Sequence, residues 1–296
     1  MAVMIGYIVV LVAVIVGYII TGGALSALFQ PFEFLILMGA TIGACLASNT
    51  AHNLKAMLLA MCETLRSSHN NPQLAAELLS LLLIILTRAR QEGMLALDIE
   101  NSHLHNGLFQ RYPRVYSHKI LITCITDCLR LRLMGNLDER DIDMMMIMET
   151  DALEEEYTFP IDGITRLADT MPAFGIIAAV LGVIHALGSI DHSTYELSTL
   201  VSQAMVGTLL GILISYGFLA PLATRLRHEY EGSLRLMHCV RLVMLADMRG
   251  YAPQISVEFG RKSFYSDERP SFEEMEGIIR QSQYLERYGI ESSLNG

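Results

Sequence analysis

The stretch "MPAFGIIAAVLGVIHALGSI" (Met171–Ile190) is 20 residues long and almost entirely apolar. A helix that crosses the hydrocarbon core of a bilayer needs about 20 such residues. The stretch nevertheless opens with a proline and is rich in Gly and Ala, whereas Leu or Ile would serve a lipid-facing helix as well. Small side chains let helix backbones approach closely in a membrane, so this segment is expected to pack against other helices.

Three further stretches reach spanning length, at Met4–Ile20, Phe32–Ser48 and Leu200–Ala223. The chain is 52% hydrophobic, with a mean hydropathy of +0.39, which exceeds the usual apolar share of soluble domains. The first stretch has no basic region before it and the second follows almost at once, which favours a retained helix over a cleaved signal peptide. We therefore predict an all-α integral membrane protein with four transmembrane helices and a cytoplasmic helical domain.

The distribution of basic residues predicts the orientation. Of the 21 Lys and Arg residues, eleven lie in Lys55–Arg166 and ten in Arg225–Arg287, and the connectors 21–31 and 191–199 contain none. Because positive charge stays on the cytoplasmic side, the long middle region and the tail are expected in the cytoplasm. Four spans then place both termini inside, in a bacterial inner membrane.

These features divide the chain into four parts. We expect transmembrane helices 1 and 2 in residues 1–49, a cytoplasmic helical domain in 50–169, transmembrane helices 3 and 4 in 170–223, and a cytoplasmic helix and tail in 224–296. Within the cytoplasmic parts, helices are predicted at about 53–68, 73–91, 117–134 and 138–156, and after the fourth span as far as Gly250. The apolar run Leu78–Leu86 is too short before Arg88 to be a fifth span.

Composition and motifs argue against several classes of function. The net charge of −10 is unsuited to a nucleic-acid-binding protein, which needs a basic face. Cys124 and Cys128 are four residues apart without the further ligands that zinc requires, so we expect no metal. No phosphate-binding loop or nucleophile motif is present, and we therefore expect neither a cofactor nor an enzyme.

Small residues recur at helical spacing in three of the predicted spans. This spacing indicates tight packing between helices, some of which could belong to other chains. The residues concerned are Gly39 and Gly43 in the second span, Ala178, Ala179 and Gly182 in the third, and Ala204, Thr208, Gly211 and Ser215 in the fourth.

Ionisable residues are nearly absent from the spans, although a protein that carries protons by itself would normally contain one. Only Glu33 and His185 are candidates, both near the outer side. Each could relay or attract protons, but a packed neutral histidine and an interfacial carboxylate bonded to backbone are the favoured interpretations. A titrating carboxylate would then come from a partner. Pro172 and Pro221 each remove a backbone donor and can bend their helices. They could act as hinges, give the wall of a pore its shape, or only affect how the helices pack.

The sequence resembles the MotA family, the stator subunits of the bacterial flagellar motor, almost from end to end. The most specific blocks are "YIITGGALSALFQPFEFLILMGATIG", "MPAFGIIAAVLGVIHALGSI", "AMVGTLLGILISYGFLAPLAT" and "GYAPQISVEFGRKSFYSDERPSF". The resemblance implies a ring of subunits, expected to be a pentamer, around two copies of MotB. Each MotB helix would carry the aspartate that binds the transported ion, and the complex would convert ion flow into torque.

The resemblance also implies roles for individual residues. Pro172 and Pro221 match the family's two membrane prolines, which couple ion binding to movement, and Thr208 matches its pore-side threonine. Ala179 stands where sodium-driven relatives have a threonine that helps to bind the ion. Because an alanine offers sodium no oxygen ligand, the transported ion is expected to be H⁺. Arg90 matches the basic contact to the rotor protein FliG.

The acidic rotor contact and several roles remain open between alternatives. The chain is two residues shorter after Arg90 than the family pattern, so either Asp98 or Glu100 could be that acidic contact. Without the resemblance, the Thr208 hydroxyl would bond the i−4 carbonyl of its own helix, and Arg90 would suit the end of a helix dipole.

The sequence fits two other functions less well. One is an energiser of outer-membrane processes like ExbB and TolQ, and the other is a membrane-bound enzyme. Four spans and the "GRKSFYSDERPSF" tail argue against the first. The lack of clustered ionisable or metal-binding residues argues against the second.

Overall fold

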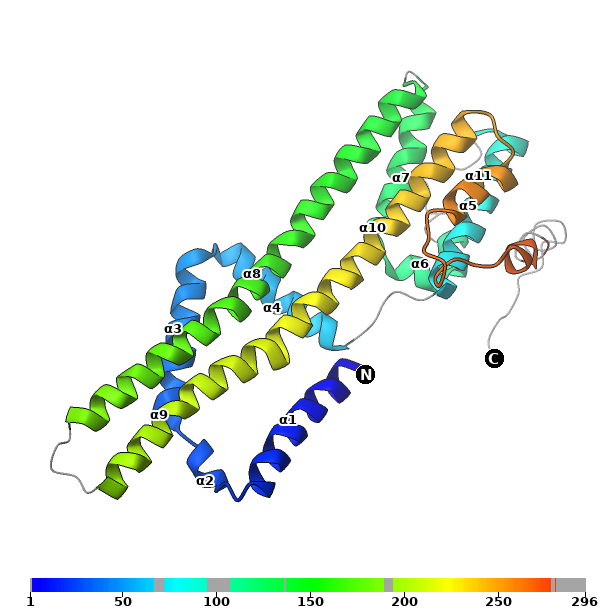
Figure 1. Ribbon diagram of the computed structural model, residues 1–296. Helices are drawn as coiled ribbons and strands as arrows, with labels where there is room; N and C mark the ends of the chain where they lie inside the picture. Colours follow the sequence, from blue (N-terminus) through cyan, green and yellow to red (C-terminus); the bar gives the residue numbers. More distant parts are fainter. Residues whose placement is uncertain are drawn as a thin grey trace. The chain divides into compact units, whose positions relative to one another are not determined.

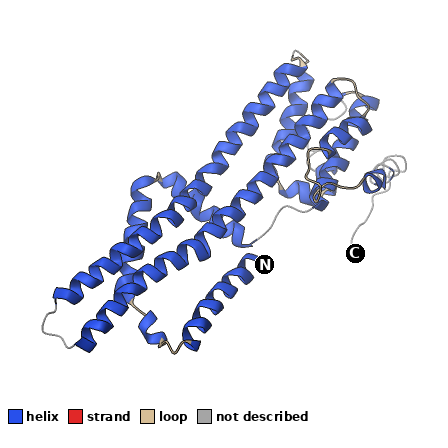
Figure 2. Cartoon of the chain, in the orientation of Figure 1, coloured by secondary structure: helices blue, strands red, loops and turns tan. Residues whose placement is uncertain are grey.

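The computed structural model describes residues 2–66, 72–94, 107–135, 137–188, 194–277 and 280, and in these ranges it contains helices and no strands (Figures 1 and 2). This agrees with the predicted fold class. The helices are α1 (Ala2–Ile20), α2 (Leu25–Leu28), α3 (Pro31–Ser48), α4 (Ala51–Arg66), α5 (Pro72–Glu92), α6 (Pro113–Ser117), α7 (Lys119–Met134), α8 (Glu139–Gly188), α9 (Thr194–Ile214), α10 (Ala220–Met248) and α11 (Pro253–Arg261), with a 3₁₀ turn η3 (Phe109–Arg111) and a π-helical segment η4 (Ser215–Leu219).

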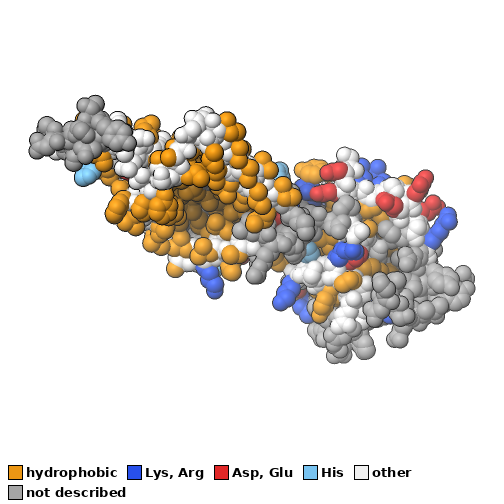
Figure 3. All heavy atoms as spheres, turned by 90° about the horizontal axis from the view of Figure 1, so that it is seen from below, with side chains coloured by type: hydrophobic (Ala, Val, Ile, Leu, Met, Phe, Trp, Pro, Cys, Tyr) orange, Lys and Arg blue, Asp and Glu red, His pale blue; other side chains and the backbone are white. Residues whose placement is uncertain are grey.

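The chain forms two compact units, each built from two separate stretches of sequence. The first unit comprises residues 1–68 and 155–229, and the second comprises residues 69–154 and 230–296. Four helical stretches in the described ranges are long and apolar enough to cross a membrane, and they coincide with the four predicted spans. In Figure 3 hydrophobic side chains cover most of the visible surface of the first unit, while charged side chains gather on the second.

Helix α8 is longer than the sequence indicated. We expected an acidic helix over 138–156 that leads through "YTFP" into a separate third span, but α8 is one helix of 50 residues with Pro160 and Pro172 in its interior. A proline lacks the N–H that would bond the i−4 carbonyl. A helix in a membrane protein can continue through such a position when a neighbouring group bonds the freed carbonyl, and a bond of this kind is described below.

The core of the second unit forms around α5. The run Leu78–Leu86, which resembles a short span in sequence, is almost wholly buried and packs with apolar residues of α7, α10 and α11. Its burial explains why the run is hydrophobic on all sides, since a helix enclosed in a core has no solvent-facing stripe. The interpretation of this run as a packed helix agrees with the structure.

A buried carboxylate connects three helices of this unit. The Asp247 side chain on α10 is 6% exposed. Its Oδ1 accepts from Arg90 Nη2 of α5 at 3.1 Å, and its Oδ2 forms an ion pair with Arg132 Nη2 of α7 at 2.8 Å. Arg132 is itself only 15% exposed, and its Nη1 has no hydrogen-bond partner in the described part of the chain. Removal of the carboxylate would leave a buried cation without its counter-charge.

The tail folds onto the second unit by a helix that the sequence did not indicate. Helix α10 ends before Gly250, whose φ of +86° favours glycine, and this end was predicted. The motif "YAPQ" (251–254) follows this end, and its Pro253 begins α11, because proline suits the first turn of a helix. Buried Arg261 bonds both carboxylate oxygens of Glu258 and the Pro270 carbonyl, and the pKa of Glu258 is lowered by this hydrogen bonding.

We expect Asp247→Asn to destabilise the second unit by about 3 kcal/mol, because it breaks a buried ion pair and leaves Arg132 uncompensated. Denaturant-induced unfolding of the full-length chain in detergent, followed by protease resistance of the α5 and α10 segments, measures the loss. Asp127→Asn is the matched control, since Asp127 pairs with Arg130 at 3.4 Å on the surface and both side chains are about half exposed. An equal response of the two variants would contradict the central role of Asp247.

Candidate functional site

The site centres on the contact between α8 and α9, where two helix backbones touch through glycines. A Cβ added to Gly175 would lie 2.9 Å from the Gly207 carbonyl oxygen, and one added to Gly211 would lie 2.9 Å from the Met171 carbonyl oxygen. Both contacts are to backbone atoms, which cannot rotate away from the added group as a flexible side chain can. The small residues that form this contact, here called the glycine seam, are Gly175, Ala178, Gly182, Ala204, Gly207, Thr208 and Gly211.

Thr208 bonds across the seam. Its Oγ1 donates to the Gly175 carbonyl of α8 at 3.3 Å. This differs from the alternative that the sequence offers without the family resemblance, in which the hydroxyl bonds the i−4 carbonyl of its own helix. The reason is the absence of a side chain at Gly175, which brings that carbonyl within reach of the facing helix. Thr208 therefore helps to fix the position of α9 on α8.

Ser215 supplies the donor that Pro172 lacks. In a regular α-helix the carbonyl of Ala168 would accept from the backbone N–H of residue 172, which is a proline. The Ser215 hydroxyl, fully buried, instead donates to the Ala168 carbonyl. The freed carbonyl thus gains a partner from the neighbouring helical segment, and α8 passes through Pro172 without ending.

Pro221 is the second residue of α10, two positions after the π-helical segment η4 ends at Leu219. A π-turn inserts one residue into a helix and is frequent at functional sites. Tyr7 of α1 contacts this segment: its hydroxyl donates to the Phe218 carbonyl at 2.8 Å, and the two rings lie 4.9 Å apart. Both predicted membrane prolines therefore stand where the regular helical hydrogen bonding changes, Pro172 inside α8 and Pro221 at the start of α10.

Glu33 lies over the seam from α3. A Cβ at Gly182 would lie 2.9 Å from Glu33 Oε1, and one at Gly207 would lie 2.8 Å from Glu33 Oε2, so the two glycines leave room for the carboxylate. Oε2 is buried and has no hydrogen-bond partner among the described residues. This differs from the favoured expectation of a carboxylate bonded to backbone. The seam is therefore neutral except for one carboxyl group at its side.

Ala179 is buried, with 8% of its surface exposed. Its methyl group presents no oxygen, and the described residues contain no group of three or more His, Cys, Asp or Glu side chains that could hold a metal ion. His185, the other ionisable candidate, has an exposed side chain. The arrangement around α8 and α9 can therefore fix helix positions closely, but it offers few ligands of its own to an ion.

Arg90, the predicted basic contact to the rotor, belongs to the second unit. Arg90, at the end of α5, donates to Asp247 and to the Tyr251 carbonyl, yet its side chain remains 42% exposed. A partner can therefore reach Arg90, although Asp247 and the Tyr251 carbonyl already accept from its Nη2. Asp98 and Glu100 lie outside the described residues. The roles of all three in rotor contact stay predictions.

Sequence reasoning did not predict the contacts of two residues of the site. Ser215 was noted only as the end of a small-residue stripe, and Glu33 was a candidate for attracting or relaying protons near the outer side, without a predicted position over the seam. The rule that a proline at one position frees the carbonyl four residues earlier identifies Ala168 from sequence alone. It does not identify the donor, because the partner lies 47 positions away in the chain.

The chain matches two family descriptions. Residues 4–93 match "Motility protein A N-terminal", and residues 118–238 match "MotA/TolQ/ExbB proton channel family". The chain is 43% identical to the Motility protein A of Escherichia coli over 282 residues, which cover 95% of each chain. It is 33% identical to the Chemotaxis protein LafT of Vibrio parahaemolyticus, over 94% of this chain and 98% of that protein.

Solved structures show the same fold. The flagellar MotAB stator complex from Bacillus subtilis aligns with a TM-score of 0.67 at 27% identity, over 86% of this chain and 92% of that one. MotAB from C. jejuni aligns with a TM-score of 0.75 at 21% identity, over 92% of this chain and 98% of that one. Sequence and fold therefore agree along nearly the whole length, and the chain belongs to the Motility protein A family of flagellar stator subunits.

Proposed function

We propose that this chain forms, with a MotB partner, a proton-conducting stator that converts ion flow into torque on the rotor protein FliG. The observation that carries the proposal is the glycine seam, at which Ser215 bonds the carbonyl that Pro172 frees, in a chain of the MotA family. The Bacillus subtilis and C. jejuni structures are titled as MotAB complexes, which supports MotB as the partner. The assembly is a pentameric ring in the inner membrane, with both termini in the cytoplasm.

In this proposal the partner supplies the titrating group. An isolated charge is costly in a membrane interior, so a MotB aspartate next to the seam is stable when it is protonated and costly when it is ionised. Each proton that binds or leaves therefore changes the electrostatic free energy of the pore by the difference between the ionised and the protonated aspartate. The MotA-type chain catalyses no covalent step, and it needs no cofactor. Its own contribution is a wall that fits closely and can adopt two arrangements.

Pro172 and Ser215 provide a physical means of movement in this wall. The Ser215 bond to the Ala168 carbonyl comes from a side chain, and it can be exchanged for water without unwinding the helix. The bend of α8 at Pro172 can therefore change at smaller cost than in a helix whose backbone bonds are continuous. We propose that charging of the partner's aspartate biases this bend, and that the second unit then moves against FliG through Arg90 and either Asp98 or Glu100.

The central test is complementation. A stator-deficient strain that expresses this chain together with its MotB should swim in soft agar, and it should lose swimming when either protein is omitted. Restoration of an outer-membrane transport defect without motility would instead favour an energiser like ExbB and TolQ.

We predict that Gly175→Ala reduces swimming to the level of the stator-deficient strain. The new Cβ would lie 2.9 Å from the Gly207 carbonyl and 3.2 Å from Thr208 Cα, so the two helices must separate. Gly6→Ala is the control, because its Cβ meets nothing within 4 Å, and we expect this variant to swim normally. Immunoblots verify equal expression. Normal swimming of Gly175→Ala would show that the seam is not a functional contact.

We predict that motility is independent of sodium. Ala179 offers no oxygen to a hard cation, which requires several, and the same swimming speed is expected in sodium and potassium media of equal ionic strength. A protonophore should stop swimming in both. Swimming that needs sodium and resists the protonophore would refute the assignment of H⁺.

We predict that Arg90→Glu abolishes most swimming, and that an opposite charge reversal in FliG partly restores it, because complementary charges guide such a transient contact. The control is Asp247→Asn, which removes the internal partner of Arg90 without changing its charge. At a temperature at which that variant stays folded, it should swim. If no FliG reversal restores Arg90→Glu, Arg90 acts in the fold of the second unit and not at the rotor.

A further inference from the structure

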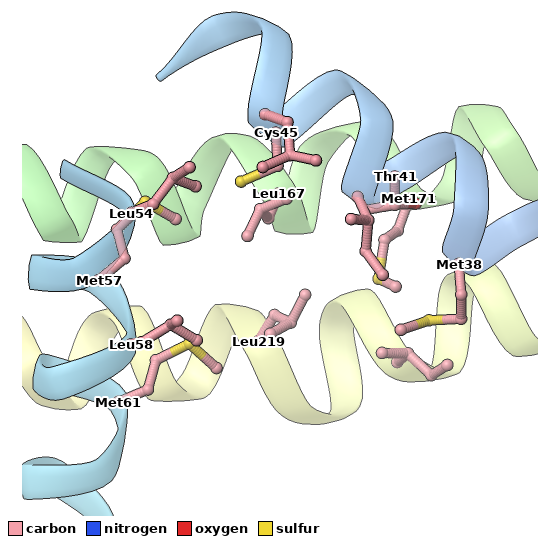
Figure 4. Close-up of a pocket in the computed structure, with 13 residues that line it drawn as sticks. Met38, Thr41, Cys45, Leu54, Met57, Leu58, Met61, Leu167, Met171 and Leu219 are labelled. Atoms are coloured by element: carbon pink, nitrogen blue, oxygen red, sulfur yellow. The ribbon is translucent and has the colours of Figure 1, made fainter. Parts of the chain in front are cut away.

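The first unit contains an apolar cavity on the side of α8 that faces α3 and α4. Its volume is about 430 Å³, and its wall includes residues of α3, α4, α8, α9 and η4 (Figure 4). The lining residues are Met38, Thr41, Ile42, Cys45, Leu46, Leu54, Met57, Leu58, Met61, Leu167, Met171, Ile214 and Leu219. The one hydroxyl among them, that of Thr41, already donates to the Leu37 carbonyl at 2.8 Å. A ligand that fills this space must therefore be apolar.

The length of the cavity suits a hydrocarbon chain. Along α3 the lining residues extend from Met38 to Leu46, a rise of about 12 Å at 1.5 Å per residue. Part of an extended acyl chain can lie along a wall of this length.

The position of the cavity also suits a lipid. Helix α4 begins at Ala51, soon after α3 ends at Ser48, and two of its leucines, Leu58 and Leu59, are 65% and 53% exposed. An amphipathic helix of this kind next to a span is typical of the membrane interface. In the proposed orientation this is the cytoplasmic side, where anionic lipids attract basic residues.

Two exposed basic residues adjoin the lining. Lys55 directly follows Leu54, and Arg166 directly precedes Leu167. We propose that the cavity binds one acyl chain of an anionic phospholipid from the cytoplasmic leaflet, whose phosphate pairs with Lys55 and Arg166. The flexible methionines of the wall can adapt to chains of different shape.

Such a lipid would lie against the moving parts of the wall. Met171 precedes Pro172. Ile214 precedes the π-helical segment, at whose start Ser215 bonds α8, and Leu219 is the last residue of that segment. Occupancy would fill the space beside the proline bend and restrain it. The fatty-acid and headgroup composition of the membrane would therefore act on the same bend that the ion pathway uses.

The absence of tryptophan from the chain gives a direct test. Leu58→Trp places one reporter in the cavity wall, and Ile8→Trp places one on exposed α1, outside the lining. Each full-length variant is purified with its MotB partner and placed in nanodiscs that contain increasing fractions of phospholipid with brominated acyl chains, which quench tryptophan. The emission of the parental complex is subtracted. Met61→Trp is the second cavity reporter if Leu58→Trp fails to assemble.

Brominated phosphatidylglycerol should half-quench the cavity reporter at a mole fraction roughly tenfold lower than brominated phosphatidylcholine does, since two basic residues favour the anionic headgroup. The α1 reporter should respond equally to both lipids. Lys55→Gln with Arg166→Gln should abolish the preference, while Lys119→Gln in the second unit should preserve it.

Two results would overturn the proposal. Equal quenching of the cavity reporter by the two lipids would mean that it senses only the surrounding bilayer. Quenching of the α1 reporter alone would mean that protein, such as a second copy of this chain, covers the cavity.

Discussion

The structure of the membrane unit depends on the approach of two helix backbones at the glycine seam. Where Gly175 faces Gly207, no side chain separates α8 from α9, and a single added methyl group would meet a carbonyl oxygen at 2.9 Å. The same closeness allows the Thr208 hydroxyl to reach across to α8. In lipid there is no hydrophobic force to hold helices together, so packing of this kind and the hydrogen bonds that it permits supply the attraction.

The close contact between the two helices also determines how the chain accommodates Pro172. A proline in a lone membrane helix would leave a carbonyl without a donor, at a cost of several kcal/mol. Here Ser215 reaches the Ala168 carbonyl because the two helices lie so close. The result is a helix that continues through Pro172 with a side-chain bond in place of a backbone bond. In the proposed function, this is the position at which charging of the partner's aspartate changes the bend of α8.

The parts of this architecture that depend on local pattern were predictable. Apolar length identified the four helical stretches that are long enough to cross a membrane, helical spacing of small residues identified the packing faces of α8 and α9, and Gly250 marked the end of α10. The same spacing in α3 did not identify a contact, since a Cβ on Gly39 or Gly43 would meet nothing within 4 Å. The continuity of α8 was not predictable, since the partner that lets it pass Pro172 lies on another helix. Nor were α11, which begins at a proline that first looks like a break, and the position of Glu33 over the seam. Each of these depends on residues that are distant in sequence.

The π-helical segment Ser215–Leu219 is a place where the chain can change its length without changing its direction. Each residue of an α-helix turns the chain by about 100°, and the π-turn accommodates one residue more than a regular turn. Deletion of a single residue here would let a regular helix form and would leave the later side chains of α10 facing nearly as they do now, because the π-turn already absorbs that residue. Deletion of a residue further along α10 would instead turn every later side chain by about 100°. Homologous chains should therefore tolerate a one-residue change of length in this segment more readily than in the regular helix that follows it.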